Sequence, residues 1–227
     1  MNITYLELPT QDLIAQRDFY SDVLGLPVNL SPLKLEVKAG KTDLVFTPAA
    51  PDFDGAYHFA FNIPENHFQA AKAWISERIP LLRNEVGTDE YNFINWNAHA
   101  LYFKDSTGNI LEFIARHNLK NASEDAFDSS QILQVSEIGL PSPDVVAFAN
   151  ELCTQMGLTV FRAQQPDKEF TPLGDDNGLF IVPVVGRLWL PTHNPGIPAK
   201  LLPVRVKLNI DGKDRAIDGV PYEIHTR

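Results

Sequence analysis

Hydrophobic and polar positions along the chain follow two periods, and these periods recur in a fixed order. Residues 3–8, "ITYLEL", alternate with period two, which predicts a β-strand. Thr10 can then cap a helix that we expect to run from about Gln11 to Leu24 and to stop at Gly25. Three short strands are predicted after this helix, at "PVNLS" (27–31), "LKLEVKAG" (33–40) and "DLVFTPA" (43–49).

The same order of one strand, one helix and three strands is repeated before residue 117. "YHFAFNI" (57–63) predicts the strand, and residues 65–79 predict a helix that buries one apolar face. Three further strands are expected, at "LRNEV" (82–86), "HALYFK" (99–104) and "NILEFIAR" (109–116). The first 117 residues therefore contain two modules with the same predicted layout.

A polar and acidic stretch, residues 118–131, is typical of a linker, and the pattern restarts after it. "ILQVSEIGL" (132–140) predicts a strand, and Ser142 with Pro143 opens a helix that Gly157 ends. The repeat then decays into strands, predicted at "LTVFRA" (158–163), "EFTPLG" (169–174), "GLFIVPVV" (178–185), "LLPVRVKLNI" (201–210) and "VPYEIHT" (220–226). We therefore expect a two-domain α+β protein, with a complete domain at 1–117 and a degenerate copy at 132–227.

Composition and charge narrow the possible partners. The net charge of −10 argues against a nucleic-acid or anionic-membrane partner, because such surfaces select basic patches. The sequence has no run of about 18 apolar residues, so no membrane span is expected. The N-terminus has no signal-like apolar core, and Cys153 is the single cysteine, so we expect a cytoplasmic protein without an intramolecular disulfide.

One carboxylate stands out because Glu112 lies in the middle of the apolar strand "NILEFIAR". A buried carboxylate without a partner costs several kcal/mol, so Glu112 should be paired, exposed or bound to a cation. Strand parity places Glu112 on one face with Ile110 and Ile114. The same parity places His58 and Asn62 together on one face of the preceding strand.

Taken together, "QDLIAQRDFYSDVLGLPV", "HFAFNIPENHFQAAKAWI" and "YFKDSTGNILEFIAR" resemble the vicinal oxygen chelate superfamily. This superfamily includes glyoxalase I, bleomycin-resistance proteins and extradiol dioxygenases. The resemblance covers residues 1–117 and, more loosely, residues 132–185. It implies tandem βαβββ modules that curl into a cup, with ligands pointing inward from the first and last strands of the modules.

The resemblance also implies a metal site. His58 and Glu112 match metal-ligand positions of the family, and the position usually filled by His in the first strand holds Tyr5. Glu7 lies on the same face as Tyr5 and could substitute for it or pair with Arg116. The implied cofactor is a divalent metal (Fe, Mn, Zn or Ni), with the metal-free state left open, and Tyr102 is the candidate proton donor or hydrogen-bond partner.

The second domain offers fewer candidates. Glu137 occupies the family's first-ligand position there, but Arg205 stands where a histidine would be expected, which favours a structural ion pair. Trp189 in "GRLWLPT" is expected to pack over the seam between the domains. The candidate ligand-binding residues in the whole chain are Asn62, Tyr91, Phe93, Trp96 and Arg187.

Two hypotheses of different classes follow, and a third possibility is a protein that keeps only the fold and has a structural or interaction role. In the first, the protein is a metal-dependent enzyme of lyase, isomerase or dioxygenase type that acts on a small oxygen-chelating substrate. In the second, it is a metal-free protein of the bleomycin-resistance kind that sequesters a small molecule in an aromatic cup. The expected partner is a small-molecule ligand, and the protein is expected to be a monomer or homodimer.

Overall fold

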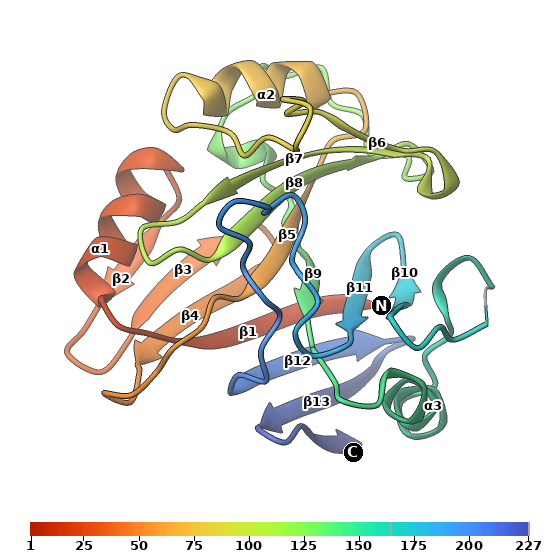
Figure 1. Ribbon diagram of the computed structural model, residues 1–227. Helices are drawn as coiled ribbons and strands as arrows, with labels where there is room; N and C mark the ends of the chain where they lie inside the picture. The colour runs from red at the N-terminus through yellow and green to blue at the C-terminus, as the bar shows by residue number, and fades with distance from the viewer. Residues whose placement is uncertain (164, 227) are drawn as a thin grey trace.

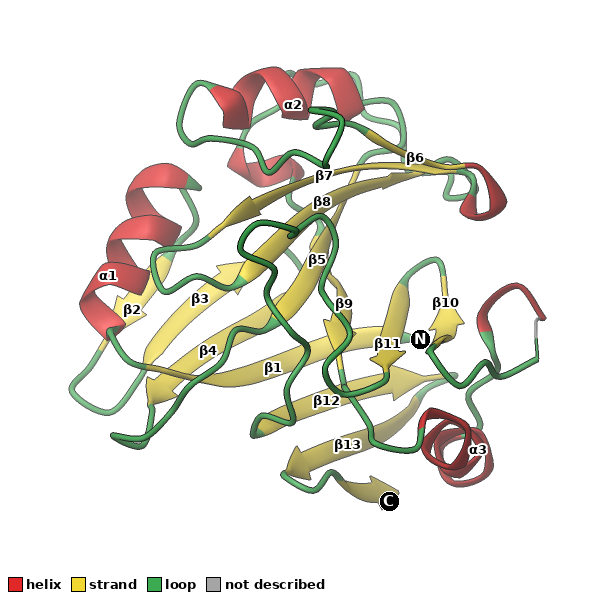
Figure 2. Cartoon of the chain, in the orientation of Figure 1, coloured by secondary structure: helices red, strands yellow, loops and turns green. Residues whose placement is uncertain are grey.

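The computed structural model describes residues 1–163 and 165–226, which form two seven-stranded sheets with helices around them (Figures 1 and 2). In spatial order, the strands of the first sheet, sheet A, are β14 (Glu223–Thr226), β13 (Lys213–Gly219), β12 (Val204–Ile210), β1 (Asn2–Thr10), β4 (Thr42–Pro48), β3 (Leu35–Ala39) and β2 (Val28–Leu30). Those of the second sheet, sheet B, are β10 (Phe170–Asp175), β11 (Gly178–Pro183), β9 (Gln134–Gly139), β5 (His58–Ile63), β8 (Ile110–Arg116), β7 (Ala98–Lys104) and β6 (Tyr91–Phe93). The order of the elements confirms an α+β protein in which a strand, a helix and a group of further strands recur along the chain.

The helices are α1 (Leu13–Asp18), which continues as the π-helical turn η1 (Phe19–Val23), α2 (Phe68–Ser76) and α3 (Val145–Met156). Short 3-10 turns lie at η2 (Ile94–Trp96), η3 (Ser129–Gln131) and η4 (Phe161–Ala163). Asp12, rather than Thr10, caps α1, because its carboxylate accepts hydrogen bonds from the backbone N–H groups of Ile14 and Ala15. No helix in the described part of the chain is long and apolar enough to cross a membrane.

Each sheet joins strands from both halves of the chain. The first strand β1 pairs antiparallel with β12, and the first strand β5 pairs antiparallel with β9. This pairing corrects the expectation that the two modules of residues 1–117 form one cup with each other. The first strand of a module lies at the edge of that module's sheet, where its outer backbone N–H and C=O groups need another strand as a partner. The local sequence pattern does not indicate which strand that partner is.

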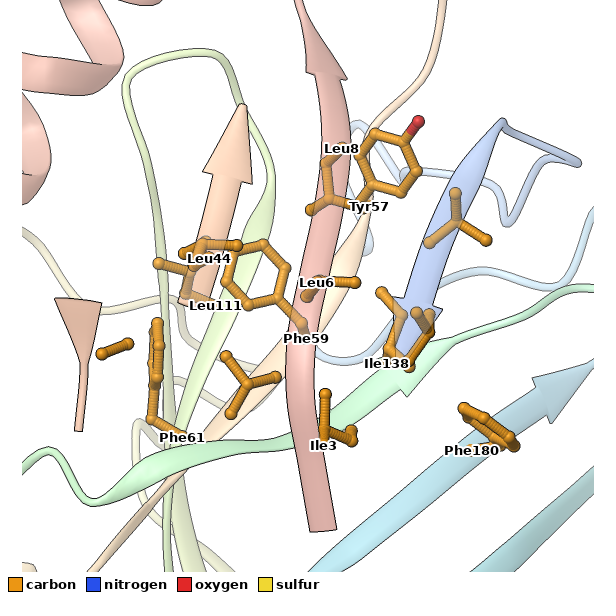
Figure 3. Close-up of a cluster of buried hydrophobic side chains, with 14 of the residues drawn as sticks. Ile3, Leu6, Leu8, Leu44, Tyr57, Phe59, Phe61, Leu111, Ile138 and Phe180 are labelled. Carbon is orange, nitrogen blue, oxygen red and sulfur yellow. The ribbon is translucent and has the colours of Figure 1, made fainter. Parts of the chain in front are cut away.

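The hydrophobic core lies between the two sheets. Leu6 and Leu8 of β1 meet Phe59 and Phe61 of β5 in one buried cluster (Figure 3). Because side chains alternate along a strand, the neighbouring residues His58 and Ala60 on β5 face away from this core. The outer face of sheet B therefore presents the candidate site residues.

Two predicted segments differ from the observed elements, and two observed strands, β6 and β13, were not predicted. "LRNEV" is a turn, because the Asn84 side chain accepts hydrogen bonds from the backbone N–H groups of Val86 and Thr88. The second half of "LTVFRA" is the helical turn η4, in which Arg162 has a positive φ of 60°. Strand β13 was not predicted, because its sequence "KDRAIDG" is polar on both faces and shows no alternation.

Candidate metal centre and ligand cavity

Three neighbouring strands bring His58, Glu112 and Glu137 together on the outer face of sheet B. Strand β5 lies between β8 and β9, and Ala60 is the register partner of both Glu112 and Glu137. Because Ala60 has only a methyl group, it leaves space between the two carboxylates. One ligand atom from each of the three residues lies within 4.8 Å of the others, and their exposed fractions are only 2–6%.

The orientation of His58 is fixed by a backbone hydrogen bond. Its Nδ1 lies 3.1 Å from the carbonyl oxygen of Ile110, which can only accept, so Nδ1 carries the proton. The lone pair on Nε2 then faces Glu112, at 3.6 Å from Oε2. Burial lowers the pKa of His58 to about 4, so the imidazole is neutral at pH 7.

The pKa of each of the two carboxylates is affected by neighbouring groups that act in opposite directions. Burial raises the pKa of Glu112 well above its usual range, and the neighbouring Glu137 raises it further. Arg116 and a hydrogen bond from Tyr102 act in the other direction. Burial also raises the pKa of Glu137, which forms an ion pair with the completely buried Arg116. Arg116 thus balances one of the two carboxylates, and the second carboxylate is left with a proton or a cation as its partner.

A cavity of about 230 Å³ opens onto this group. It is lined by His58, Phe93, Trp96, Tyr102, Glu112, Glu137, Phe170, Ile181, Arg187, Trp189 and Leu190. The loop between β11 and β12 supplies Arg187, Trp189 and Leu190 and runs across the outer face of sheet B (Figure 1). The Trp189 ring centre lies 5.1 Å from that of His58. Gly139 makes this possible, because a Cβ there would lie 2.5 Å from the indole.

The structure brings most of the sequence-predicted residues to one place. His58, Glu112 and Tyr102 meet at the base of the cavity, and Phe93, Trp96 and Arg187 line it. Trp189 packs over His58 and so covers the seam between strands from the two halves of the chain.

Two predicted ligand-binding residues lie elsewhere. Tyr91 packs edge-to-face against Tyr102 at 5.0 Å between ring centres and stands behind the cavity wall. Asn62 donates a hydrogen bond to the carbonyl oxygen of Asp176 and lines a separate hollow of about 460 Å³. Asn62 shares the parity of His58 as expected, but it lies four residues further along β5 and therefore beyond the cavity.

Tyr5 and Glu7 do not join His58 and Glu112, because β1 belongs to sheet A. The Tyr5 hydroxyl donates a hydrogen bond to Glu7, and Glu7 forms an ion pair with Arg205 at 3.6 Å. The expected contact of Glu7 with Arg116 is therefore not made. Arg205 pairs with Glu7 and Asp218 rather than with Glu137.

Sequence reasoning placed Glu137 in a ligand position but assigned it to a separate ion pair. The structure makes it the third member of the group, because β9 is the pairing partner of β5. The predicted strand "ILQVSEIGL" carries a carboxylate in a mainly apolar stretch, as "NILEFIAR" does. That shared pattern was the signal that could have linked Glu137 with Glu112.

No protein-family model matches the sequence, and no curated protein matches it. Among solved structures, a putative dioxygenase from Bacillus subtilis is 14% identical and aligns over 99% of this chain and 82% of its own, with a TM-score of 0.61. A lactoylglutathione lyase from Agrobacterium tumefaciens is 23% identical over 49% of this chain and 90% of its own, with a TM-score of 0.41. A glyoxalase/bleomycin resistance protein/dioxygenase from Nocardioides is 19% identical over 56% of this chain and 89% of its own, also with a TM-score of 0.41. The full-length alignment shows that the chain shares its fold with the putative dioxygenase.

Proposed function

We propose that the protein is a metal-dependent enzyme that acts on a small substrate with two neighbouring oxygens, as a lyase, isomerase or dioxygenase. His58, Glu112 and Glu137 are the proposed metal ligands. The observation that carries this proposal is that two buried hydrogen-bond acceptors, His58 Nε2 and the carboxylate of Glu112, lie only 3.6 Å apart.

The donor set fits a divalent ion. A neutral imidazole and two carboxylates are ligands that Fe(II), Mn(II), Zn(II) and Ni(II) accept, and each residue can turn one atom to a common point. A divalent ion held there would act as a Lewis acid toward two adjacent oxygens of a substrate.

The surrounding residues position the ligands. Ile110 holds the His58 ring, and Tyr102 donates a hydrogen bond to Glu112. Burial, together with the charge of Glu112, raises the pKa of Tyr102 well above its usual range, so its phenol keeps its proton. Tyr102 therefore acts as a hydrogen-bond donor that orients Glu112 rather than as an acid that releases a proton. Trp189 covers His58 and excludes water from this end of the cavity.

A metal-free binding protein is the second candidate, and the Arg116–Glu137 ion pair favours it. Arg116 already neutralises Glu137, and a single proton shared by His58 and Glu112 would satisfy the remaining acceptors. The same aromatic cavity would then sequester a small molecule without chemistry.

Metal binding distinguishes the two candidates. We expect elemental analysis of protein purified without chelators to find a stoichiometric divalent metal. Glu112→Gln and His58→Gln should each lose it, with affinity falling by more than the roughly 10–100-fold that loss of an outer-layer partner costs. Glu7→Gln is the matched control, because it removes a carboxylate from the corresponding face of sheet A and should keep the metal. Absence of metal from the parent, with no heat of binding for Mn(II), Fe(II), Zn(II) or Ni(II) by calorimetry, would favour the binding protein.

A further inference from the structure

We infer that the ligand of this cavity carries a carboxylate and that Arg187 binds it. The inference deepens the proposed function, because it assigns the group that the substrate carries in addition to the two chelated oxygens. It concerns a different wall of the cavity from His58, Glu112 and Glu137, namely the loop between β11 and β12.

Among the residues that the structure describes, Arg187 is a cation without an anionic partner. It is half-buried, it lines the cavity, and its guanidinium lies 4.7 Å from the ring centre of Phe170. Within residues 1–163 and 165–226, no carboxylate forms an ion pair with it. The two other arginines near this end of the sheet are both paired, Arg116 with Glu137 and Arg162 with Asp176. A planar guanidinium whose fork is unused is suited to bidentate contact with a carboxylate.

The backbone around Arg187 is fixed before any ligand arrives. The Arg187 N–H donates to the carbonyl oxygen of Val184, and its own carbonyl accepts from the N–H of Ala199, at 3.1 and 2.8 Å. The loop is therefore tied to itself on both sides of the residue. Such pre-organisation reduces the entropy that binding would otherwise cost.

The size and walls of the cavity limit the rest of the ligand. A cavity of about 230 Å³ exceeds the roughly 150 Å³ that can hold benzene, and it lies below the range of about 300–1,000 Å³ typical of drug-sized ligands. The walls are largely aromatic, from Phe93, Trp96, Phe170 and Trp189, and aromatic walls prefer a flat apolar body. The ligand body is therefore about one ring in size.

One residue of the cavity wall also has an unpaired hydrogen-bond donor in the described structure. The indole N–H of Trp189 is buried and has no acceptor among the described groups. An oxygen of the ligand is the missing acceptor, because a buried donor without a partner is costly. This observation is independent of Arg187 and points to an oxygen-bearing ligand in the same cavity.

The charges at the cavity support an anion. Glu112 and Glu137 carry one negative charge each when ionised, and Arg116 and Arg187 carry one positive charge each. A divalent metal would then leave two positive charges, which a substrate with one ionised chelating oxygen and one carboxylate neutralises. A neutral substrate would leave Arg187 desolvated without compensation.

Benzoate and benzamide are the probes, since they share one ring and differ in charge. We expect calorimetry on the full-length protein to show benzoate binding about tenfold more tightly than benzamide, as a charge-assisted contact implies. Arg187→Gln should remove this preference by weakening benzoate binding alone, and Arg187→Lys should retain part of it. Arg83→Gln is the control, because Arg83 is an exposed arginine paired with Asp89 and should leave both affinities unchanged. Circular dichroism should show that each variant keeps its fold.

The titrations are run on metal-loaded and chelator-treated protein so that the two proposals can fail separately. An Arg187-dependent preference for benzoate in a parent that binds no metal would support the carboxylate inference and refute the metal-dependent enzyme. Stoichiometric metal with equal binding of benzoate and benzamide would support the metal-dependent enzyme and refute the carboxylate inference. Benzoate binding that Arg187→Gln leaves unchanged in a folded variant would also overturn the inference.

Discussion

The outer faces of the two sheets have the same layout and different chemistry. In each sheet a first strand pairs antiparallel with a strand from the other half of the chain. Each face also carries an ion pair between an arginine and a glutamate, from β8 and β9 on sheet B and from β12 and β1 on sheet A. On sheet B, the side chains of Arg116 and Glu137 are 0% and 3% exposed. On sheet A, those of Arg205 and Glu7 are 46% and 22% exposed.

The difference comes from what covers each face. The loop between β11 and β12 crosses sheet B, where Trp189 and Phe161 complete a second hydrophobic cluster around Ala60. The outer face of sheet A has no such cover in the described structure and forms an open hollow of about 550 Å³ beside Arg205 and Lys207. The same kinds of side chain are therefore solvated on one sheet and desolvated on the other. Desolvation, rather than the choice of residues, turns such a group into a candidate metal site.

Breaking the ion pair on each face is the strongest test of this comparison. We expect Arg116→Leu to lower the free energy of unfolding by about 3–5 kcal/mol, because it leaves Glu137 buried without a partner. Arg205→Leu should cost less than about 1 kcal/mol, because water screens an exposed pair. Urea denaturation followed by circular dichroism measures both values.

A double variant separates loss of the pair from loss of packing. Arg116→Leu combined with Glu137→Leu removes both charges, and its stability should return close to that of the parent. Similar losses for Arg116→Leu and Arg205→Leu would contradict the view that cover distinguishes the two faces.

A pH series should show the desolvation of Glu112 directly in metal-free protein. Its folded pKa lies above the ordinary value of 4.5, so the folded state keeps a proton that the unfolded state loses. Its contribution to stability therefore falls as pH rises from about 4.5 toward the folded pKa. Glu112→Gln removes this loss, so its stability relative to the parent should increase with pH, by up to about 1.4 kcal/mol per pH unit.

The measurement is urea denaturation of both proteins between pH 5 and pH 8 in the presence of chelator. His58 contributes an opposite slope between its folded value of about 4 and its ordinary value of 6.5, but it is present in both proteins. Tyr5→Phe keeps both Glu112 and its hydrogen bond from Tyr102, because β1 lies in sheet A, and serves as the control that should retain the pH dependence of the parent. A constant difference between Glu112→Gln and the parent would mean that Glu112 is solvated.

Exchanging the third ligand tests which strand completes the site. Glu137→His gives His58 and Glu112 a second imidazole, and we expect Zn(II) to bind about tenfold, or about 1.4 kcal/mol, more tightly. Asp176, at 3.8 Å from Arg116, remains as a partner for that guanidinium. Tyr5→His should leave the affinity unchanged, because β1 lies in sheet A. Calorimetry compares the two, and tighter binding by Tyr5→His alone would contradict the observed strand pairing.

The strand faces on which His58 and Glu112 lie could be predicted from local information. Period-two alternation in "YHFAFNI" and "NILEFIAR" sets the face of each residue, and parity along a strand survives folding. The third member could not be predicted in this way. Whether β5 pairs with a strand before or after residue 117 depends on contacts between distant segments, so Glu137 and Tyr5 exchanged roles relative to the expectation.

The position of the loop that covers the site also could not be predicted from the local sequence pattern. Trp189 was expected to lie over a seam, but the loop that carries it has no periodic pattern. Its position depends on Gly139, where the absence of a side chain admits the indole. The division of the chain into domains at residues 1–117 and 132–227 stays a prediction.

The smallest expected effect concerns one hydroxyl on each face. Tyr102→Phe removes the hydrogen bond to the buried Glu112, and we expect it to lower the free energy of unfolding by about 1 kcal/mol. Tyr5→Phe removes the corresponding bond to Glu7, where water can replace the hydroxyl, so its cost should be a few tenths of a kcal/mol. Thermal denaturation at matched pH measures both. The Tyr102→Phe variant should also bind metal about 10–100-fold more weakly, because it loses a partner that orients a ligand, whereas Tyr5→Phe should not. Equal effects of the two variants on both stability and metal affinity would show that Tyr102 is only a wall of the cavity.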